Sequence, residues 1–303
     1  MFLGNGCTGK TTLLHWFIDN AFKDIDLKNR TEGIIIQPLP LCDRKALGNF
    51  WDFGGQEVYH ATHRLFLGRR TLYILVWATD TPERIEEQRH PPQYWLDMIA
   101  DIADKREPSR VLIVQNLFDK HAVQHSISNE EMAAYTAQGL EISTISVNAK
   151  TGHKIKSFKL NVEEEVENLL NTYQEELPET WVHIRTAVAK RRENKEKTLT
   201  FADFEQICVD CKLVGDPSVI LGYLHRAGEV YYYAHQFQNK IILDQEWALK
   251  AVYAVLKGKR IDRYKGIFEL DDLIDIWREG NPDLTKQDAQ IFLNFMLDRK
   301  SVV

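Results

Sequence analysis

The stretch that decides the fold is GNGCTGKTT, at residues 4–12. Gly4 is followed by four residues and then by Gly9-Lys10-Thr11, which is the spacing of a phosphate-binding loop. In such a loop the glycines let backbone N–H groups turn toward a phosphate chain, the lysine adds positive charge, and the threonine hydroxyl binds Mg²⁺. Apolar residues 1–3 predict a strand before the loop, and TLLHWFIDNAF after it predicts a helix. The loop therefore predicts a nucleotide site.

Strands and helices are expected to alternate through the first half of the chain. The predicted strands are residues 33–41, 47–53, 72–80, 110–116 and 141–148, and the predicted helices are residues 12–22, 94–106, 128–138 and 151–170. This alternation predicts an α/β fold with a mostly parallel sheet, in which ligands bind at the carboxyl ends of the strands. Pro38 and Pro40 favour an edge position or an irregular end for the strand that contains them.

Composition changes after Leu177-Pro178, so we expect a first domain of residues 1–176 and a second of residues 177–303. The second is predicted to be a smaller α+β domain, with Thr200 as the N-cap of one helix. Its predicted elements are helices at 181–197, 201–213, 246–256, 268–277 and 289–298, and a hairpin from 230–234 to 241–244. The very short first strand leads us to expect a piece of a longer protein.

Charge and composition exclude several classes of protein. The formal net charge is −6, which argues against a nucleic-acid-binding surface rich in lysine and arginine. Four cysteines in 303 residues do not form a disulfide framework and favour the cytoplasm. The longest apolar runs, such as LYILVWA at 72–78, are shorter than the ~20 residues of a transmembrane helix.

Further residues follow in the order and approximate spacing of a Ras-like small GTPase, and each falls in a loop or at the carboxyl end of a predicted strand. They are Thr31, Asp52, Gly55, Gln56, Asn116, Asp119 and the run Asn148-Ala149-Lys150. Singly, each of these has an ordinary structural explanation, such as a turn residue or a strand terminator. All of them in this order favour a GTPase site.

The resemblance to Ras-like GTPases implies a role for each residue. Thr11 and Thr31 bind Mg²⁺, Asp52 holds the ion from the second coordination shell, and Gln56 orients the attacking water. Lys10 and Gln56 are the candidate catalytic residues. The full predicted nucleotide-binding set is Asn5, Gly6, Cys7, Thr8, Gly9, Lys10, Thr11, Thr12, Thr31, Gly55, Asn116, Asp119, Asn148, Ala149 and Lys150.

Two further stretches, WDFGGQEVYHATHRLFL (51–67) and HPPQYWLDMI (90–99), resemble the Roc domain, the Ras-like module of Roco proteins. KIILDQEWALKAVYAVL (240–256) resembles the start of the COR domain that accompanies Roc. The resemblance implies a multidomain signalling protein that binds guanine nucleotide with Mg²⁺, hydrolyses GTP slowly and forms a homodimer through COR. One departure is Asn116-Leu117-Phe118-Asp119, where the family has lysine at the second position; we expect guanine selectivity to survive with weaker binding.

Three functions remain open at this point. The first is a slow regulatory GTPase. The second is a scaffold or dimerisation module that guanine nucleotide gates with little hydrolysis, and the third is an ATPase. His60 and His63 follow Gln56, and we expect them to be surface or dimer-contact residues rather than catalytic bases.

Overall fold

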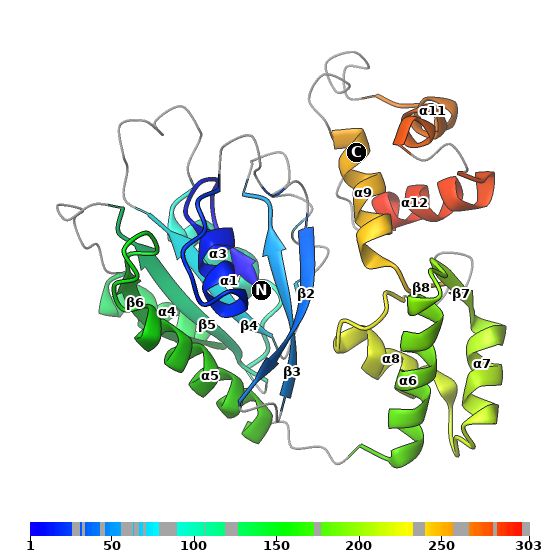
Figure 1. Cartoon of the computed structure of the whole chain (residues 1–303), viewed down its shortest axis with the longest axis horizontal. Coiled ribbons are helices and arrows are strands. Elements are labelled where there is room, and N and C mark those ends of the chain that lie inside the picture. The colour runs from blue at the N-terminus through cyan, green and yellow to red at the C-terminus, as the bar shows by residue number, and fades with distance from the viewer. Residues whose placement is uncertain are drawn as a thin grey trace. The chain divides into compact units, whose positions relative to one another are not determined.

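The chain forms two compact units, Met1–Gln174 and Glu175–Val303 (Figure 1). The computed structural model describes residues 1–25, 31, 34–42, 46–55, 63, 67–68, 71–78, 90–105, 107–118, 127–172, 177–232, 240–256, 267–280 and 284–298.

A six-stranded sheet forms the centre of the first unit, in the order β2-β3-β1-β4-β5-β6. All neighbouring pairs are parallel except β2 and β3. The mixed α/β class and the mostly parallel sheet are therefore confirmed. The strands are β1 (Phe2–Leu3), β2 (Ile34–Leu41), β3 (Ala46–Phe53), β4 (Leu72–Trp77), β5 (Ser109–Asn116) and β6 (Leu140–Val147).

The edge position expected for the proline-containing strand is the one observed for β2. Pro38 pairs with Asn49 and Pro40 pairs with Leu47, both on β3, which is the one neighbour of β2 among the described strands. Proline has no N–H to donate to a ladder, so a strand with two prolines is tolerated where one side has no partner.

Helices cover both faces of the sheet. They are α1 (Lys10–Ile18), α3 (Pro92–Ala100), α4 (Asn129–Ala137) and α5 (Ile155–Thr172). Leu13 of α1 and Phe158 of α5 share a buried cluster with Ile74 and Leu112 of the central strands. Residues one position along these strands point to the opposite face. They are equally buried, so the sheet has two covered faces.

The second unit is mainly helical, with a two-stranded antiparallel sheet of β7 and β8. Its elements are α6 (Glu179–Glu193), β7 (Thr198–Thr200), α7 (Phe201–Asp210), α8 (Pro217–Arg226), β8 (Lys240–Ile242), α9 (Gln245–Leu256), α11 (Leu270–Gly280) and α12 (Lys286–Asp298). The expected cap of α7 is present, because the Thr200 side chain accepts a hydrogen bond from the Asp203 amide. Of the expected hairpin, the described residues show one bridge, between Tyr231 and Ile242; residues 233–239 lie outside the described part of the chain.

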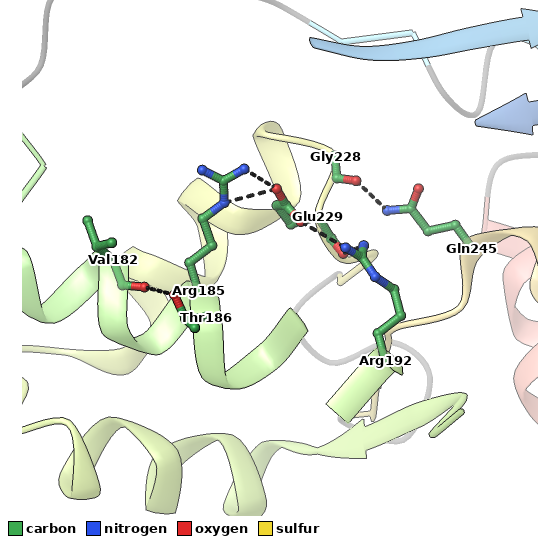
Figure 2. Close-up of polar contacts among 7 residues, drawn as sticks. All are labelled: Val182, Arg185, Thr186, Arg192, Gly228, Glu229 and Gln245. Carbon is green, nitrogen blue, oxygen red and sulfur yellow. Dashed lines mark hydrogen bonds and ion pairs between the residues drawn. The ribbon is translucent and has the colours of Figure 1, made fainter. Parts of the chain in front are cut away.

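An ion-pair cluster joins helix α6 to the segment between α8 and β8 (Figure 2). The Arg185 Nε lies 2.9 Å from Oε1 of the buried Glu229, and Arg192 reaches Oε2 at 3.4 Å. Gln245, the first residue of α9, donates to the Gly228 carbonyl at 3.0 Å. The Gly228–Glu229 segment is therefore held by two helices.

Across the described residues of the whole chain, no helix combines the length and apolar character needed to cross a bilayer.

Candidate functional site

The loop at residues 4–9 connects β1 to α1 and depends on two glycines. Gly4 has φ +132°, and a Cβ there would lie 2.0 Å from the Val76 carbonyl oxygen. Gly9 has φ +94°, and a Cβ there would lie 2.3 Å from Nδ2 of Asn116. Both positions combine a left-handed backbone with close neighbours, which glycine alone accommodates. The loop is thus packed closely against β4 and the end of β5.

Lys10 begins helix α1 and is buried, with its ammonium directed back into the loop. Its Nζ donates to the carbonyl oxygens of Gly4 at 2.9 Å and Asn5 at 2.6 Å. Thr8 adds a third hydrogen bond within the loop, from Oγ1 to the Asn5 carbonyl at 3.1 Å. A buried positive charge encircled by loop backbone is suited to attract an anion into the loop.

Three side-chain oxygens meet beside the start of α1. The Thr11 hydroxyl donates to Oδ2 of Asp52 at 2.6 Å, and the Thr31 hydroxyl lies 2.8 Å from Thr11 Oγ1 and 3.0 Å from the same carboxylate oxygen. Asp52 comes from β3, so three separate segments contribute. The structure therefore brings together the three residues predicted to surround Mg²⁺.

Asp52 is fully buried, and its other oxygen, Oδ1, has no hydrogen-bond partner among the described residues. Burial raises the pKa of Asp52, while the Thr11 hydrogen bond and the Lys10 charge oppose that rise. A carboxylate and two hydroxyls are hard oxygen ligands of the type that Mg²⁺ prefers. The orphaned oxygen and this set of donors fit a cation, which would lower the electrostatic cost of the buried charge.

Asn116, at the end of β5, joins the phosphate loop to the loop after β6. Its Nδ2 donates to the Thr8 carbonyl at 2.9 Å, and its Oδ1 accepts from the Ala149 amide at 3.0 Å. Asn116 is 1% exposed, so both bonds are sheltered from water. This side chain therefore connects two loops that both contain residues of the predicted nucleotide-binding set.

The loop after β6 is ordered by its own hydrogen bonds. The Asn148 amide donates to the His153 carbonyl at 3.1 Å, and Asn148 Oδ1 accepts from the Thr151 amide at 2.9 Å. Ala149 is buried and Lys150 is exposed. These three members of the predicted nucleotide-binding set thus form one compact turn beside Asn116.

The remaining predicted residues are placed in part. Gly6 and Cys7 form the turn of the phosphate loop, and Thr12 lies in the first turn of α1. Gly55 packs on that loop so closely that a Cβ would lie 2.4 Å from the Asn5 carbonyl oxygen. Gln56 and Asp119 lie outside the described residues. Their predicted roles stay predictions.

The expectation of a surface position for His63 is wrong. This residue is completely buried, with its ring 4.7 Å from that of Phe53 and 5.7 Å from that of Trp95. The aromatic neighbours come from β3 and α3, which a local inspection of the sequence could not bring together. His60 lies outside the described residues.

Two family models match consecutive parts of this chain. "Ras of Complex, Roc, domain of DAPkinase" matches residues 1–119, and "C-terminal of Roc, COR-A domain" matches residues 178–300. The chain belongs to the Roco family. Its first part is a Roc domain, of the Ras-like GTPase type, and its second part is a COR-A domain.

Relatives of this Roco chain are larger proteins. It is 26% identical over 272 residues to the probable serine/threonine-protein kinase pats1 of Dictyostelium discoideum, aligning 87% of the chain with 8% of that protein. It is 25% identical over 320 residues to a Roc-COR-CHAT protease of Runella zeae, aligning 97% of the chain with 33% of that protein. The chain therefore spans a third or less of these relatives.

A solved structure shows the same fold. Methanosarcina barkeri Roco2 RocCORdC bound to GDP aligns with a TM-score of 0.77 at 24% identity, covering 99% of this chain and 89% of that one.

Two contacts of the Roc domain were missed by sequence reasoning. The Asn5 side chain donates from Nδ2 to the His90 carbonyl at 2.7 Å and accepts from the His90 amide at 3.3 Å. Trp16 of α1 donates from Nε1 to the Ala149 carbonyl at 2.9 Å. Both contacts join residues more than 80 positions apart, for which the sequence offers no local signal.

Proposed function

We propose that this chain binds guanine nucleotide with Mg²⁺ and slowly hydrolyses GTP, as a molecular switch within a larger Roco signalling protein. The observation that supports this most directly is that three groups of residues lie together. The Lys10 ammonium lies inside the glycine loop, and the side-chain oxygens of Thr11, Thr31 and Asp52 meet beside it. Asn116 connects the phosphate loop to the loop after β6 by hydrogen bonds. The GDP bound to Roco2, a structural neighbour, agrees with this assignment.

In the proposed complex the phosphate chain lies in the loop at residues 4–9. The phosphate oxygens replace the Gly4 and Asn5 carbonyls as partners of the Lys10 ammonium, so its charge is already in place. Thr11, Thr31 and Asp52 surround Mg²⁺, which when bound neutralises charge on the β and γ phosphates. Gly55 brings its amide near the γ phosphate because the backbone there has no side chain to separate it from the loop.

Guanine is proposed to bind between Asn116, Asp119 and the Asn148–Lys150 turn. A carboxylate at Asp119 accepts from guanine N1 and its 2-amino group, which adenine does not offer. Lys150 is exposed, so its stem is available to cover the base. Hydrolysis depends on Gln56, which orients the attacking water.

The first experiment tests nucleotide binding itself. Fluorescent GDP is titrated into the protein with Mg²⁺, and GTP and ATP are then compared as competitors. Competition by GTP alone supports the proposal, and equal competition by ATP favours an ATPase. Lys10→Ala should abolish binding and turnover, whereas Lys156→Ala, an exposed lysine on α5, should change neither. Unchanged turnover in Lys10→Ala would place the site elsewhere.

A second experiment distinguishes the hydrolysing switch from the alternative function, a scaffold that binds guanine nucleotide with little hydrolysis. Leu117, at the position where the family has lysine, favours this alternative. Single-turnover GTP hydrolysis is measured for the wild type and for Gln56→Leu. A much slower variant supports hydrolysis by this chain. Equal, negligible rates with intact GDP binding favour a nucleotide-gated scaffold or dimerisation module.

Three broader assignments belong to the same proposal. We propose residues 1–176 as the GTPase domain and residues 177–303 as the COR-like domain, a division close to the two compact units at residues 174 and 175. The longer protein is proposed to form a homodimer through COR. A cytoplasmic location agrees with the four cysteines, all of them described residues and none of them in a disulfide bond.

A further inference from the structure

The Ala149 peptide is held on both of its sides by side chains from other elements. Its N–H donates to Oδ1 of Asn116 at 3.0 Å, and its C=O accepts from Nε1 of Trp16 at 2.9 Å. Asn116 is a predicted nucleotide residue, but nothing in the motifs points to Trp16. Trp16 therefore has no role in the nucleotide site as assigned so far.

Trp16 also packs against the far end of the same turn. Gly152 has φ +77°, and a Cβ there would lie 3.4 Å from the outer edge of the Trp16 ring, at Cη2. The ring is partly buried against the core beneath α1 and α5. The turn at residues 148–153 is thus held to the indole by one hydrogen bond, and its Gly152 lies close beside the ring.

Helix α1 contacts both ends of the proposed nucleotide site. Lys10 and Thr11 lie at its first turn, beside the phosphate loop. Trp16 lies six residues after Lys10, and therefore about 9 Å further along the axis. One rigid helix thus sets the distance between the phosphate loop and the base-binding turn.

We propose that Trp16 is a positioning residue for guanine recognition: its indole N–H fixes the Ala149 carbonyl and so orients the turn that faces the base. This inference rests on the proposed function. Trp16 acts through Ala149 and does not itself contact the nucleotide.

Three variants distinguish the contribution of the indole N–H donor from that of ring packing. Trp16→Phe keeps an aromatic ring but loses the donor. Trp16→Gln loses the ring but restores a donor, since Nε2 of glutamine is as many bonds from Cα as Nε1 of tryptophan. Trp277→Phe is the matched control, because Trp277 also donates from Nε1 to an alanine carbonyl, Ala251, at 2.9 Å, but in the second unit.

The dissociation constants of GDP and ADP are measured for each protein by displacement of fluorescent GDP in the presence of Mg²⁺. Trp16→Phe should raise the constant for GDP about 2- to 10-fold, the size of one net hydrogen bond, and leave that for ADP unchanged. The preference for GDP over ADP should therefore fall by the same factor. Trp16→Gln should recover at least half of this loss on a logarithmic scale, and Trp277→Phe should match the wild type.

Two results would overturn the inference while leaving the proposed function intact. One is a Trp16→Phe variant whose GDP-to-ADP preference equals that of the wild type, whether both dissociation constants are unchanged or both rise by the same factor. The other is a Trp16→Gln variant as weak as Trp16→Phe with wild-type melting temperature, since this would show that the restored donor does not restore binding. If the wild type itself fails to bind GDP, the proposed function fails first, and this inference with it.

Discussion

Replacing Asn116 by alanine should destabilise the first unit more than any other single polar deletion near the site. The change removes a donor to the Thr8 carbonyl and an acceptor from the Ala149 amide, and leaves both backbone groups buried without those partners. An unsatisfied buried group costs about 1–3 kcal/mol, so the free energy of unfolding should fall by about 2–6 kcal/mol. That is a large part of the ~5–15 kcal/mol typical of a domain.

The assay is hydrogen exchange in increasing urea, read by mass spectrometry, because it reports the two units separately. In Asn116→Ala, peptides covering residues 4–12 and 148–153 should lose protection together, since one side chain connects both. Asn148→Ala is the control. It removes a single hydrogen bond within an exposed turn, to the Thr151 amide, and should cost about 0.5–1.5 kcal/mol.

The reasoning would be refuted by a loss below about 1 kcal/mol in Asn116→Ala. It would also be refuted if the phosphate loop lost protection while residues 148–153 kept theirs. In that case Asn116 would support one loop and not connect two.

Three further substitutions have defined outcomes. Asp52→Asn should stabilise the nucleotide-free protein at pH 8, because burial raises the pKa of this carboxyl and makes its charged form unfavourable in the folded state. In urea unfolding, the gain in stability over the wild type should shrink as the pH falls toward the folded pKa, because the wild-type carboxyl then becomes neutral. Mg²⁺ titration of the same variant should show weaker binding. Gly55→Ala should weaken GDP binding about 5- to 150-fold, as ~1–3 kcal/mol of overpacking against the Asn5 carbonyl predicts, and wild-type affinity would disprove that contact. Glu229→Gln should lower the melting temperature of the second unit by the equivalent of about 1 kcal/mol, since the half-exposed Arg185 is partly screened by water; an unchanged melting temperature would show that the ion pair adds nothing.

Much of the first unit could be predicted because its signals are local. Each of these signals is contained in a few neighbouring residues: the glycine-lysine-threonine loop, the alternation of apolar strands with helices, and the prolines of β2. The start of α4 is similar, since Ser128 and Glu131 form a capping box at its first turn. Elements of this kind were placed within a few residues of their observed bounds.

The second unit was harder to predict because its elements are short and depend on distant partners. Strand β7 has three residues, too few to show alternation, and it pairs with β8 across forty positions of chain. Helix α8 was missed although Asp216-Pro217 is an ordinary helix start, with the aspartate side chain accepting from the Ser218 amide. Of the expected hairpin partner of β8, the described residues 230–232 contribute one bridge, from Tyr231, and residues 233 and 234 lie outside the described part of the chain.

The candidate site likewise contains residues that the sequence predicts and contacts that it does not. The chemistry of Lys10, Thr11 and Asp52 follows from residue type and order, which the sequence shows directly. The Asn5–His90 and Trp16–Ala149 contacts depend on the tertiary fold. The burial of His63 was mispredicted for the same reason, because its aromatic neighbours lie on separate elements.

The two prolines of β2 affect more than the placement of that strand. An exposed sheet edge offers a row of N–H and C=O groups to which a foreign strand can attach, and this is a route to aggregation. Residues two apart in a strand direct their backbone groups to the same side, so Pro38 and Pro40 together remove two donors from the side of β2 that does not face β3. A strand of a second molecule that paired with this side of β2 would therefore lack two donors of a continuous ladder, which disfavours extension of the sheet beyond β2.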